Sequence, residues 1–243
     1  MWRPVRTADG SWTLEHSGHG QACHSHSGAW LQARARYAEP CRLQHLARER
    51  GVVRVLDIGT GLGLNLAAAA RAAAQGGGRM QAVTLERDSR VLQAAFELPD
   101  WPADIAEHLA PIHAALREQL AHSSSSATLD LRLGDARERL TELSLEPFDA
   151  VFLDPFSPQV EPELWSEAFL AAVARRMAPH AVLSTYSASL GVRTTLARVG
   201  LAVGLGPRVG TKASGTLASF ETSLPELEPR VARKLARRLE RTN

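Results

Sequence analysis

The stretch RVLDIGTGLGLN, residues 54–65, constrains the fold of this 243-residue chain more than any other feature. A short apolar run ends at Asp57, a turn follows with glycine at every second position, and a helix-like segment begins at Leu64. A buried strand that passes through a glycine turn into a helix is typical of the βα unit of a parallel sheet. The stretch therefore predicts a strand over Val52–Asp57 and a helix over Leu64–Ala74.

The same alternation of strand-like and helix-like segments continues along the chain, which predicts an α/β fold with a parallel sheet covered on both faces. The expected strands are Val52–Asp57, Met80–Glu86, Leu129–Gly134, Phe148–Asp154, Ala181–Tyr186 and, with a weaker pattern, Leu201–Leu205. The expected helices are Leu64–Ala74, Ser89–Phe96, Asp104–Ala121, Ala136–Leu143, Pro162–Met177 and Leu190–Val199. Such sheets bind ligands at the carboxyl ends of their strands.

The two ends of the chain lack this alternation. The first fifty residues are rich in Gly, Ser and His, and a short hairpin is expected around Asp9–Gly10. Gly28–Arg50 forms either one helix or two, with Pro40 as the break. Pro229–Arg241 is expected to be an Arg-rich helix with a narrow apolar stripe. This helix is either a solvated terminal element or a contact for RNA phosphates.

Composition excludes several classes of protein. With 44% hydrophobic residues the chain can bury a sizeable core. It contains no uninterrupted run of 18 apolar residues, so no membrane span is expected. Cys23 and Cys41 are too few for a disulfide framework and are expected to be reduced thiols in a cytoplasmic protein. The net charge of +2 argues against a general nucleic-acid coat. No metal site is expected, because the N-terminal His and Cys residues match no closed tetrahedral spacing.

The glycine turn narrows the ligand. A dinucleotide fingerprint would need its third glycine at position 64, which is Leu64. A phosphate loop would need a following Gly-Lys-Ser/Thr, which the turn lacks. Gly59, Gly61 and Gly63 instead let a ligand lie flat against the backbone, where a Cβ would collide. A tight turn without a ligand is the alternative interpretation.

Four successive expected strands end in acids: Asp57, Glu86, Asp135 and Asp154. Each alone is explained as a helix N-cap, but in a parallel sheet all four line one edge. Glu86 there accepts hydrogen bonds from ribose hydroxyls, and Asp135 accepts from an exocyclic amine. Four acids beside a glycine turn fit an adenosine ligand that is neutral or cationic.

Several stretches resemble the methyltransferase module of the MnmC family over most of residues 7–220. They are TADGSWTL, HSHSGAWLQAR, LDIGTGLGLN, LDLRLGDARERL, FDAVFLDPFSPQVEPELW and GTLAS. The resemblance implies a Rossmann-like class I methyltransferase with a mostly parallel seven-stranded sheet flanked by helices. It implies an N-terminal lid over residues 1–50, a methyltransferase core over 51–224 and an Arg-rich C-terminal helix over 225–243, as a standalone module. The implied reaction is methylation of the 5-aminomethyl group of the tRNA wobble uridine with S-adenosylmethionine (SAM) as donor, after a separate enzyme supplies that group.

The resemblance also implies roles for individual residues. The expected SAM-binding residues are Asp57, Gly59, Thr60, Gly61, Gly63, Asn65, Glu86, Asp135, Asp154, His24 and Ser27. Asp154 is the expected catalytic residue, because a carboxylate there accepts an N–H bond from an amine and orients its lone pair. The expected substrate-binding residues are Pro155, Phe156, Tyr186 and Lys212. Methylation or aminopropyl transfer on another amine, and a SAM-binding subunit without catalysis, are the alternative functions.

Overall fold

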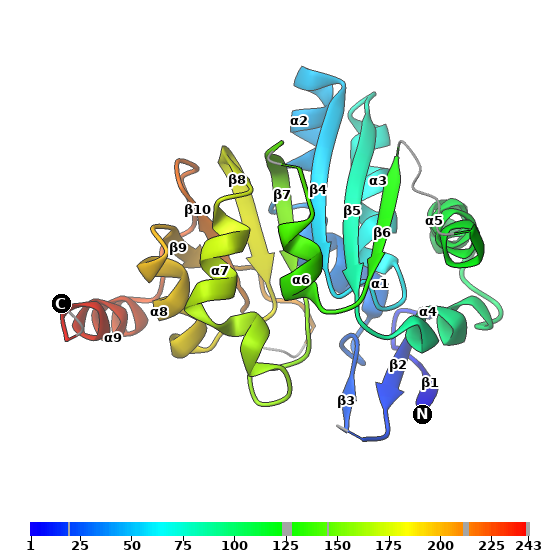
Figure 1. Ribbon diagram of the computed structural model, residues 1–243, viewed down its shortest axis with the longest axis horizontal. Helices are drawn as coiled ribbons and strands as arrows, with labels where there is room; N and C mark the ends of the chain where they lie inside the picture. The colour runs from blue at the N-terminus through cyan, green and yellow to red at the C-terminus, as the bar shows by residue number, and fades with distance from the viewer. Residues whose placement is uncertain (19, 123–127, 145, 211–213, 242–243) are drawn as a thin grey trace.

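The computed structural model describes residues 1–18, 20–122, 128–144, 146–210 and 214–241. Its centre is a seven-stranded sheet (Figure 1) in the order β6-β5-β4-β7-β8-β10-β9. The strands are β6 (Leu129–Leu133), β5 (Arg79–Glu86), β4 (Val52–Ile58), β7 (Phe148–Leu153), β8 (Met177–Thr185), β10 (Thr216–Ser219) and β9 (Ala202–Leu205). The pairs from β6 to β8 are parallel, whereas β10 is antiparallel to both of its neighbours. This arrangement confirms the mostly parallel seven-stranded sheet.

Helices cover both faces of the sheet (Figure 1), because alternate side chains of each strand point to opposite faces. One face packs against α1 (Ala29–Gln32), the π-helix η1 (Ala33–Ala38), α2 (Leu43–Arg50), α3 (Leu64–Gln75), α4 (Ser89–Phe96) and α5 (Ala103–His122). The other packs against α6 (Ala136–Thr141), α7 (Glu167–Ala174) and α8 (Leu190–Arg198). In β4, Val53 and Val55 point into the first core, whereas Leu56 and Ile58 point into the second.

The N-terminal residues form a separate antiparallel sheet of β1 (Trp2–Arg6), β2 (Trp12–His16) and β3 (Gln21–Ala22). The hairpin expected around Asp9–Gly10 is confirmed, since β1 and β2 pair on either side of it. The Asp9 carboxylate accepts hydrogen bonds from Thr7, from Ser11 and from the backbone N–H of Leu31. These bonds tie the turn of the hairpin to α1.

Gly28–Arg50 is interrupted around Pro40, which agrees with the interpretation of two helices rather than one. A turn containing Pro40 and Arg42, whose φ is 57°, separates η1 from α2.

The expected helix over Pro162–Met177 is wrong in extent. This segment instead begins with a 3₁₀ helix, η2 (Pro162–Trp165), which is followed by α7. The N-cap of α7, Ser166, accepts a hydrogen bond from the Phe169 N–H at 3.3 Å. β8 begins at Met177 rather than at Ala181, because Met177 pairs with Phe148 before a shift in register. None of the helices in the described part of the chain is long and apolar enough to cross a membrane.

Candidate active site

The carboxyl ends of β4, β5, β6 and β7 meet at one edge of the sheet. Ile58 pairs with Leu85 on one side and with Leu153 on the other, and Glu86 pairs with Leu133. The residues that follow these strands therefore lie side by side, which confirms the expected alignment of the strand ends.

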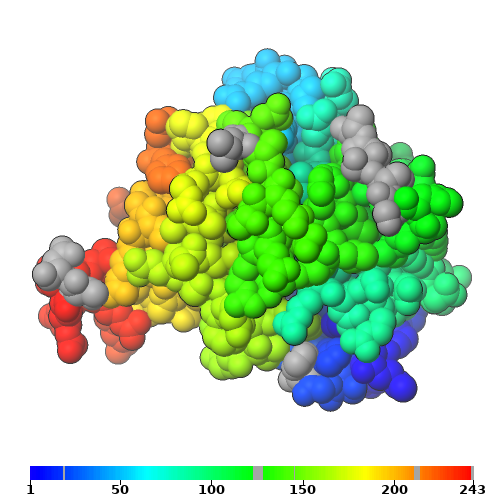
Figure 2. Space-filling view, viewed as in Figure 1, coloured from blue at the N-terminus to red at the C-terminus, as the bar shows by residue number. Residues whose placement is uncertain are grey.

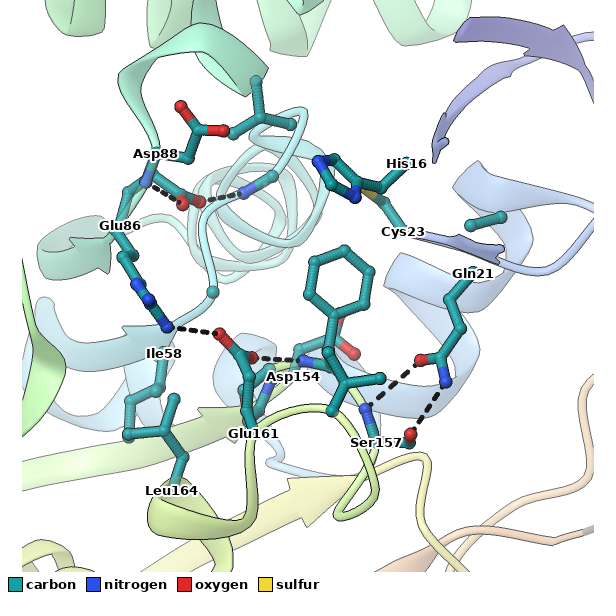
Figure 3. A pocket seen from close by; sticks show the side chains of 18 of the residues that line it. His16, Gln21, Cys23, Ile58, Glu86, Asp88, Asp154, Ser157, Glu161 and Leu164 are labelled. Atoms are coloured by element: carbon teal, nitrogen blue, oxygen red, sulfur yellow. Dashed lines mark hydrogen bonds and ion pairs between the residues drawn. The ribbon is translucent and has the colours of Figure 1, made fainter. Parts of the chain in front are cut away.

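A cavity of about 1170 Å³ lies at this edge, between the sheet and the N-terminal segment that contains β3. Its volume exceeds the ~300–1,000 Å³ of ordinary small-molecule sites, so it has room for more than one small ligand. The sequence-predicted residues that line it are Gly59, Gly61, Glu86, Asp135, Asp154, His24, Ser27, Pro155, Phe156 and Tyr186. Figure 3 shows the side chains of several of its lining residues.

The Glu86 carboxylate is held at the floor of the cavity by backbone N–H groups (Figure 3). It accepts hydrogen bonds from the N–H of Gly61 at 3.0 Å and of Asp88 at 2.9 Å. Burial raises its pKa to about 7, although these backbone hydrogen bonds act in the opposite direction. Glu86 is thus fixed in position and still has lone pairs for further donors.

The Asp154 carboxylate is held from two sides. The Tyr37 hydroxyl donates to one oxygen at 2.5 Å, and the Asn65 side-chain amide donates to the other at 2.9 Å. Burial and the neighbouring Asp154 raise the pKa of Tyr37 well above its usual range, so this hydroxyl remains a donor. Tyr37 was missed in the sequence, because it lies in a helical stretch whose tertiary contact with β7 leaves no local pattern.

Four of the expected SAM-binding residues do not line the cavity: Asp57, Thr60, Gly63 and Asn65. The Asp57 carboxyl is fully buried and accepts a hydrogen bond from the Thr84 hydroxyl at 2.8 Å, and Thr84 also contacts the Thr60 hydroxyl at 2.6 Å. Burial raises the pKa of Asp57 well above its usual range. This arrangement does not fit the expectation that Asp57 binds SAM directly.

Asp135 lines the cavity but already has a partner. Its carboxylate caps α6 by accepting from the Arg137 N–H at 2.9 Å, and it also accepts from the Arg137 guanidinium. The hydrogen bond from this guanidinium lowers the pKa of Asp135 to about 2. An amine at Asp135 would share the carboxylate with Arg137, a competition that the sequence did not reveal.

The loop after β7 is stiffened at its backbone. The Phe156 N–H donates to the Glu161 carboxylate at 2.8 Å (Figure 3), and its carbonyl accepts from the Trp165 indole at 2.8 Å. The Tyr186 hydroxyl donates to the Pro155 carbonyl at 3.0 Å. Tyr186 therefore has a satisfied hydroxyl and holds this loop as well as lining the cavity.

The N-terminal sheet is attached to the same loop. Gln21 and Ser157 form two hydrogen bonds, of 2.8 and 3.3 Å (Figure 3), and the Trp2 ring stacks on the Phe156 ring with 6.0 Å between centroids. One face of Phe156, an expected substrate-binding residue, is thus covered by Trp2, a contact between distant segments that the sequence could not show.

His24 and Ser27 line the cavity from the N-terminal side. His24 is buried, and its backbone N–H donates to the Thr13 hydroxyl at 2.9 Å. A Cβ on Gly210 would lie only 2.4 Å from the Ser27 Cβ, so Gly210 packs directly on this segment. Lys212 lies outside the described residues. Within those residues no group of three or more His, Cys, Asp or Glu side chains is placed to hold a metal.

Comparisons with known proteins agree with this geometry. A family model described as S-adenosyl-L-methionine-dependent methyltransferase matches residues 101–221. The bifunctional protein MnmC for tRNA 5-methylaminomethyl-2-thiouridine biosynthesis from Aromatoleum aromaticum is 36% identical over 74% of this chain and 30% of its own length. The protein of that name from Paracidovorax citrulli is 34% identical over 87% of this chain and 34% of its own. The chain therefore spans about a third of the length of these relatives.

A solved structure covers more of the chain. The crystal structure of MNMC2 from Aquifex aeolicus superimposes with a TM-score of 0.85 at 34% identity, over 97% of this chain and 76% of that chain. The fold, with Gly59, Gly61, Glu86 and Asp154 at the carboxyl edge of its sheet, defines a class I SAM-dependent methyltransferase. The chain belongs to the MnmC methyltransferase family.

Proposed function

We propose that this protein methylates the 5-aminomethyl group on the wobble uridine of tRNA, with SAM as the methyl donor. The names of the MnmC relatives support the substrate. The observation that carries the chemistry is the Asp154 carboxylate, which lines the cavity while Tyr37 and Asn65 fix both of its oxygens. A fixed acceptor at this edge suits an amine substrate.

The residues that line the cavity fit SAM. Gly59 and Gly61 present backbone without Cβ atoms, and Glu86 offers an acceptor for two ribose hydroxyls. When bound, SAM supplies an electron-poor methyl group on a sulfonium. Since this ligand is cationic, the acids along the edge favour its binding electrostatically.

Asp154 prepares the amine for attack. An amine attacks only as the neutral base. Asp154 accepts a hydrogen bond from one N–H group of the amine and thereby orients the lone pair of the nitrogen. The Pro155 carbonyl is held by Tyr186 and retains a second lone pair for another N–H. Holding the amine in this way provides the alignment on which most of the rate gain depends.

The N-terminal residues complete the proposal. We assign residues 1–50 as a lid, because the bonds of Gln21 to Ser157 and the stacking of Trp2 on Phe156 attach them to the substrate loop. The proposed substrate requires a separate enzyme that makes the aminomethyl group. We also propose the cytoplasm as the location, since Cys23 and Cys41 are free thiols.

The test of this function is incubation with methyl-labelled SAM and tRNA that carries 5-aminomethyl-uridine. We expect label at the wobble nucleoside, identified by digestion and mass spectrometry, and none on tRNA with an unmodified uridine. Intact SAM binding without label on either tRNA would contradict the proposal.

A separate prediction concerns Glu86. We expect Glu86→Ala to weaken SAM binding by about tenfold or more. A carboxylate that accepts hydrogen bonds from two ribose hydroxyls contributes about 1.5–3 kcal/mol to the binding free energy. In the wild type the affinity should rise with pH through about 7, since the raised pKa leaves Glu86 partly protonated below that value and ligand donors favour the ionised form. Calorimetry between pH 6 and 8 measures both effects. Glu86→Gln, which cannot ionise, should remove the pH dependence; a dependence that persists in this variant would exclude Glu86 as its source.

A further inference from the structure

The C-terminal helix α9 (Pro229–Glu240) holds the net positive charge of the chain. It carries five Arg or Lys residues and one Glu, whereas the other 231 residues contain 23 cations and 25 acids. The body of the protein is therefore slightly acidic, and its cationic surplus lies on one terminal element.

Three of the five cations of α9 lie on one face of the helix. Leu235 is buried, with Val231 and Leu239 half-buried on the same stripe where α9 packs on α8. At about 100° per residue, Arg230, Arg233 and Arg237 lie on the side opposite this stripe. Lys234 lies at the flank of the stripe, and Arg238 lies beside it. All five are exposed: Arg230, Arg233, Lys234, Arg237 and Arg238. The apolar stripe anchors the helix, so the cationic face points to solvent.

Helix stability does not explain these charges. Cations favour the C-terminal turn of a helix, but Arg230 lies in the first turn, which contains no acid. Arg230 and Lys234, and likewise Arg233 and Arg237, are like charges four residues apart, a spacing that destabilises a helix. Among the described residues, Arg230, Arg233, Lys234 and Arg237 have no ion-pair partner within 4.0 Å. These four cations thus repel one another and form no ion pair that would offset the repulsion.

The helix is close to the active site through α8. Tyr186 lines the cavity, and the N-cap of α8, Ser189, follows three residues later, a span of at most about 10 Å. In the first turn of α8, a Cβ on Gly191 would lie 4.0 Å from the Arg238 guanidinium. Figure 1 and Figure 2 show α9 at the edge of the molecule beyond α8. A polyanion whose reactive end enters the cavity would therefore reach this face.

We propose that the exposed face of α9 docks the phosphate backbone of the substrate RNA while the nucleoside occupies the cavity; this assignment rests on the proposed function. Arg is suited to the task, because its planar guanidinium binds phosphate oxygens in pairs. The docking contributes affinity without base specificity, so the cavity alone selects the nucleoside.

The test compares two triple variants that remove the same charge. One is Arg230→Gln with Arg233→Gln and Arg237→Gln on α9. The control is Arg42→Gln with Arg48→Gln and Arg79→Gln, three exposed cations that lie before α2, within α2 and at the start of β5. Figure 1 shows α2 and β5 away from α9. Circular dichroism and SAM calorimetry check that both variants remain folded and bind the cofactor.

Two measurements follow. The first is the affinity for an unmodified RNA hairpin of anticodon-arm size as a function of salt. We expect the α9 variant to bind about tenfold more weakly at low salt and to lose about two to three from the slope of log K against log salt, roughly 0.9 per phosphate contact. The second is the steady-state rate on aminomethyl tRNA, where we expect KM to rise with kcat unchanged. The RNA affinity and KM of the control variant should match those of the wild type within about twofold, because this variant keeps all the proposed phosphate contacts and differs only in net charge.

The outcomes separate the two proposals. Equal RNA affinity and slope in the two variants, or no hairpin binding by the wild type, would overturn the docking proposal. Hairpin binding that depends on α9, in a wild type that does not methylate the tRNA, would keep the docking surface and reject the proposed reaction.

Discussion

Asp154→Asn should reduce the single-turnover rate of methyl transfer by about 10²–10⁴-fold, the usual contribution of a positioned acid or base. The substitution keeps the size of the side chain, so Asn65 and Tyr37 can still contact it. It removes the negative charge that accepts the amine N–H and favours loss of its proton. Because Glu86 and the glycine turn remain, we expect the dissociation constant of SAM to change less than about threefold.

The measurement is a single-turnover assay with saturating enzyme and labelled SAM, together with calorimetry of SAM binding. Asp130→Asn is the matched control, because Asp130 lies on β6, does not line the cavity and pairs with Arg132. Tyr37→Phe should give an intermediate loss of rate, since it frees one oxygen of Asp154 without removing the carboxylate. A rate in Asp154→Asn equal to that of the Asp130 control would remove Asp154 from the chemistry.

The sequence predicted the parallel sheet and the acids at its edge because those signals are local. A strand such as β7, FDAVFL, is buried along its whole length, and an acid directly after it needs no distant partner to be recognised. Glu86 and Asp154 could therefore be placed in one cavity from strand order alone. β10 was missed because four residues, Thr216–Ser219, are too few to show a pattern.

The contacts between distant segments could not be predicted in this way. Tyr37 reaches Asp154 across 117 positions of sequence, and Gln21 reaches Ser157 across 136. Neither the pairing of Asp135 with Arg137 nor the burial of Asp57 changes the strand pattern, although both decide which acids remain open to a ligand. The pattern identified the edge of the sheet; side-chain packing decides which of its acids are accessible.

Gly59→Ala is the second substitution with a large expected effect, because this glycine lies where two loops meet. Its φ is 94°, and a Cβ would lie 2.6 Å from the Asp154 carbonyl oxygen, which is backbone and cannot move independently of the catalytic loop. We expect a loss of stability of about 1–3 kcal/mol from overpacking, added to about 1–2 kcal/mol for the positive φ.

Gly61→Ala provides the matched comparison for this prediction. Gly61 has a φ of 52°, but a Cβ there would meet only the Cys23 side chain at 3.9 Å, an ordinary contact. Urea denaturation should therefore show Gly59→Ala to be less stable than Gly61→Ala by about the overpacking cost alone. Displacement of the Asp154 backbone should also reduce the methyl-transfer rate of the folded Gly59→Ala protein at saturating SAM, because the carboxylate moves with its loop. Equal stability and equal saturated rates in the two variants would show that the close approach of Gly59 to Asp154 does not position the catalytic carboxylate.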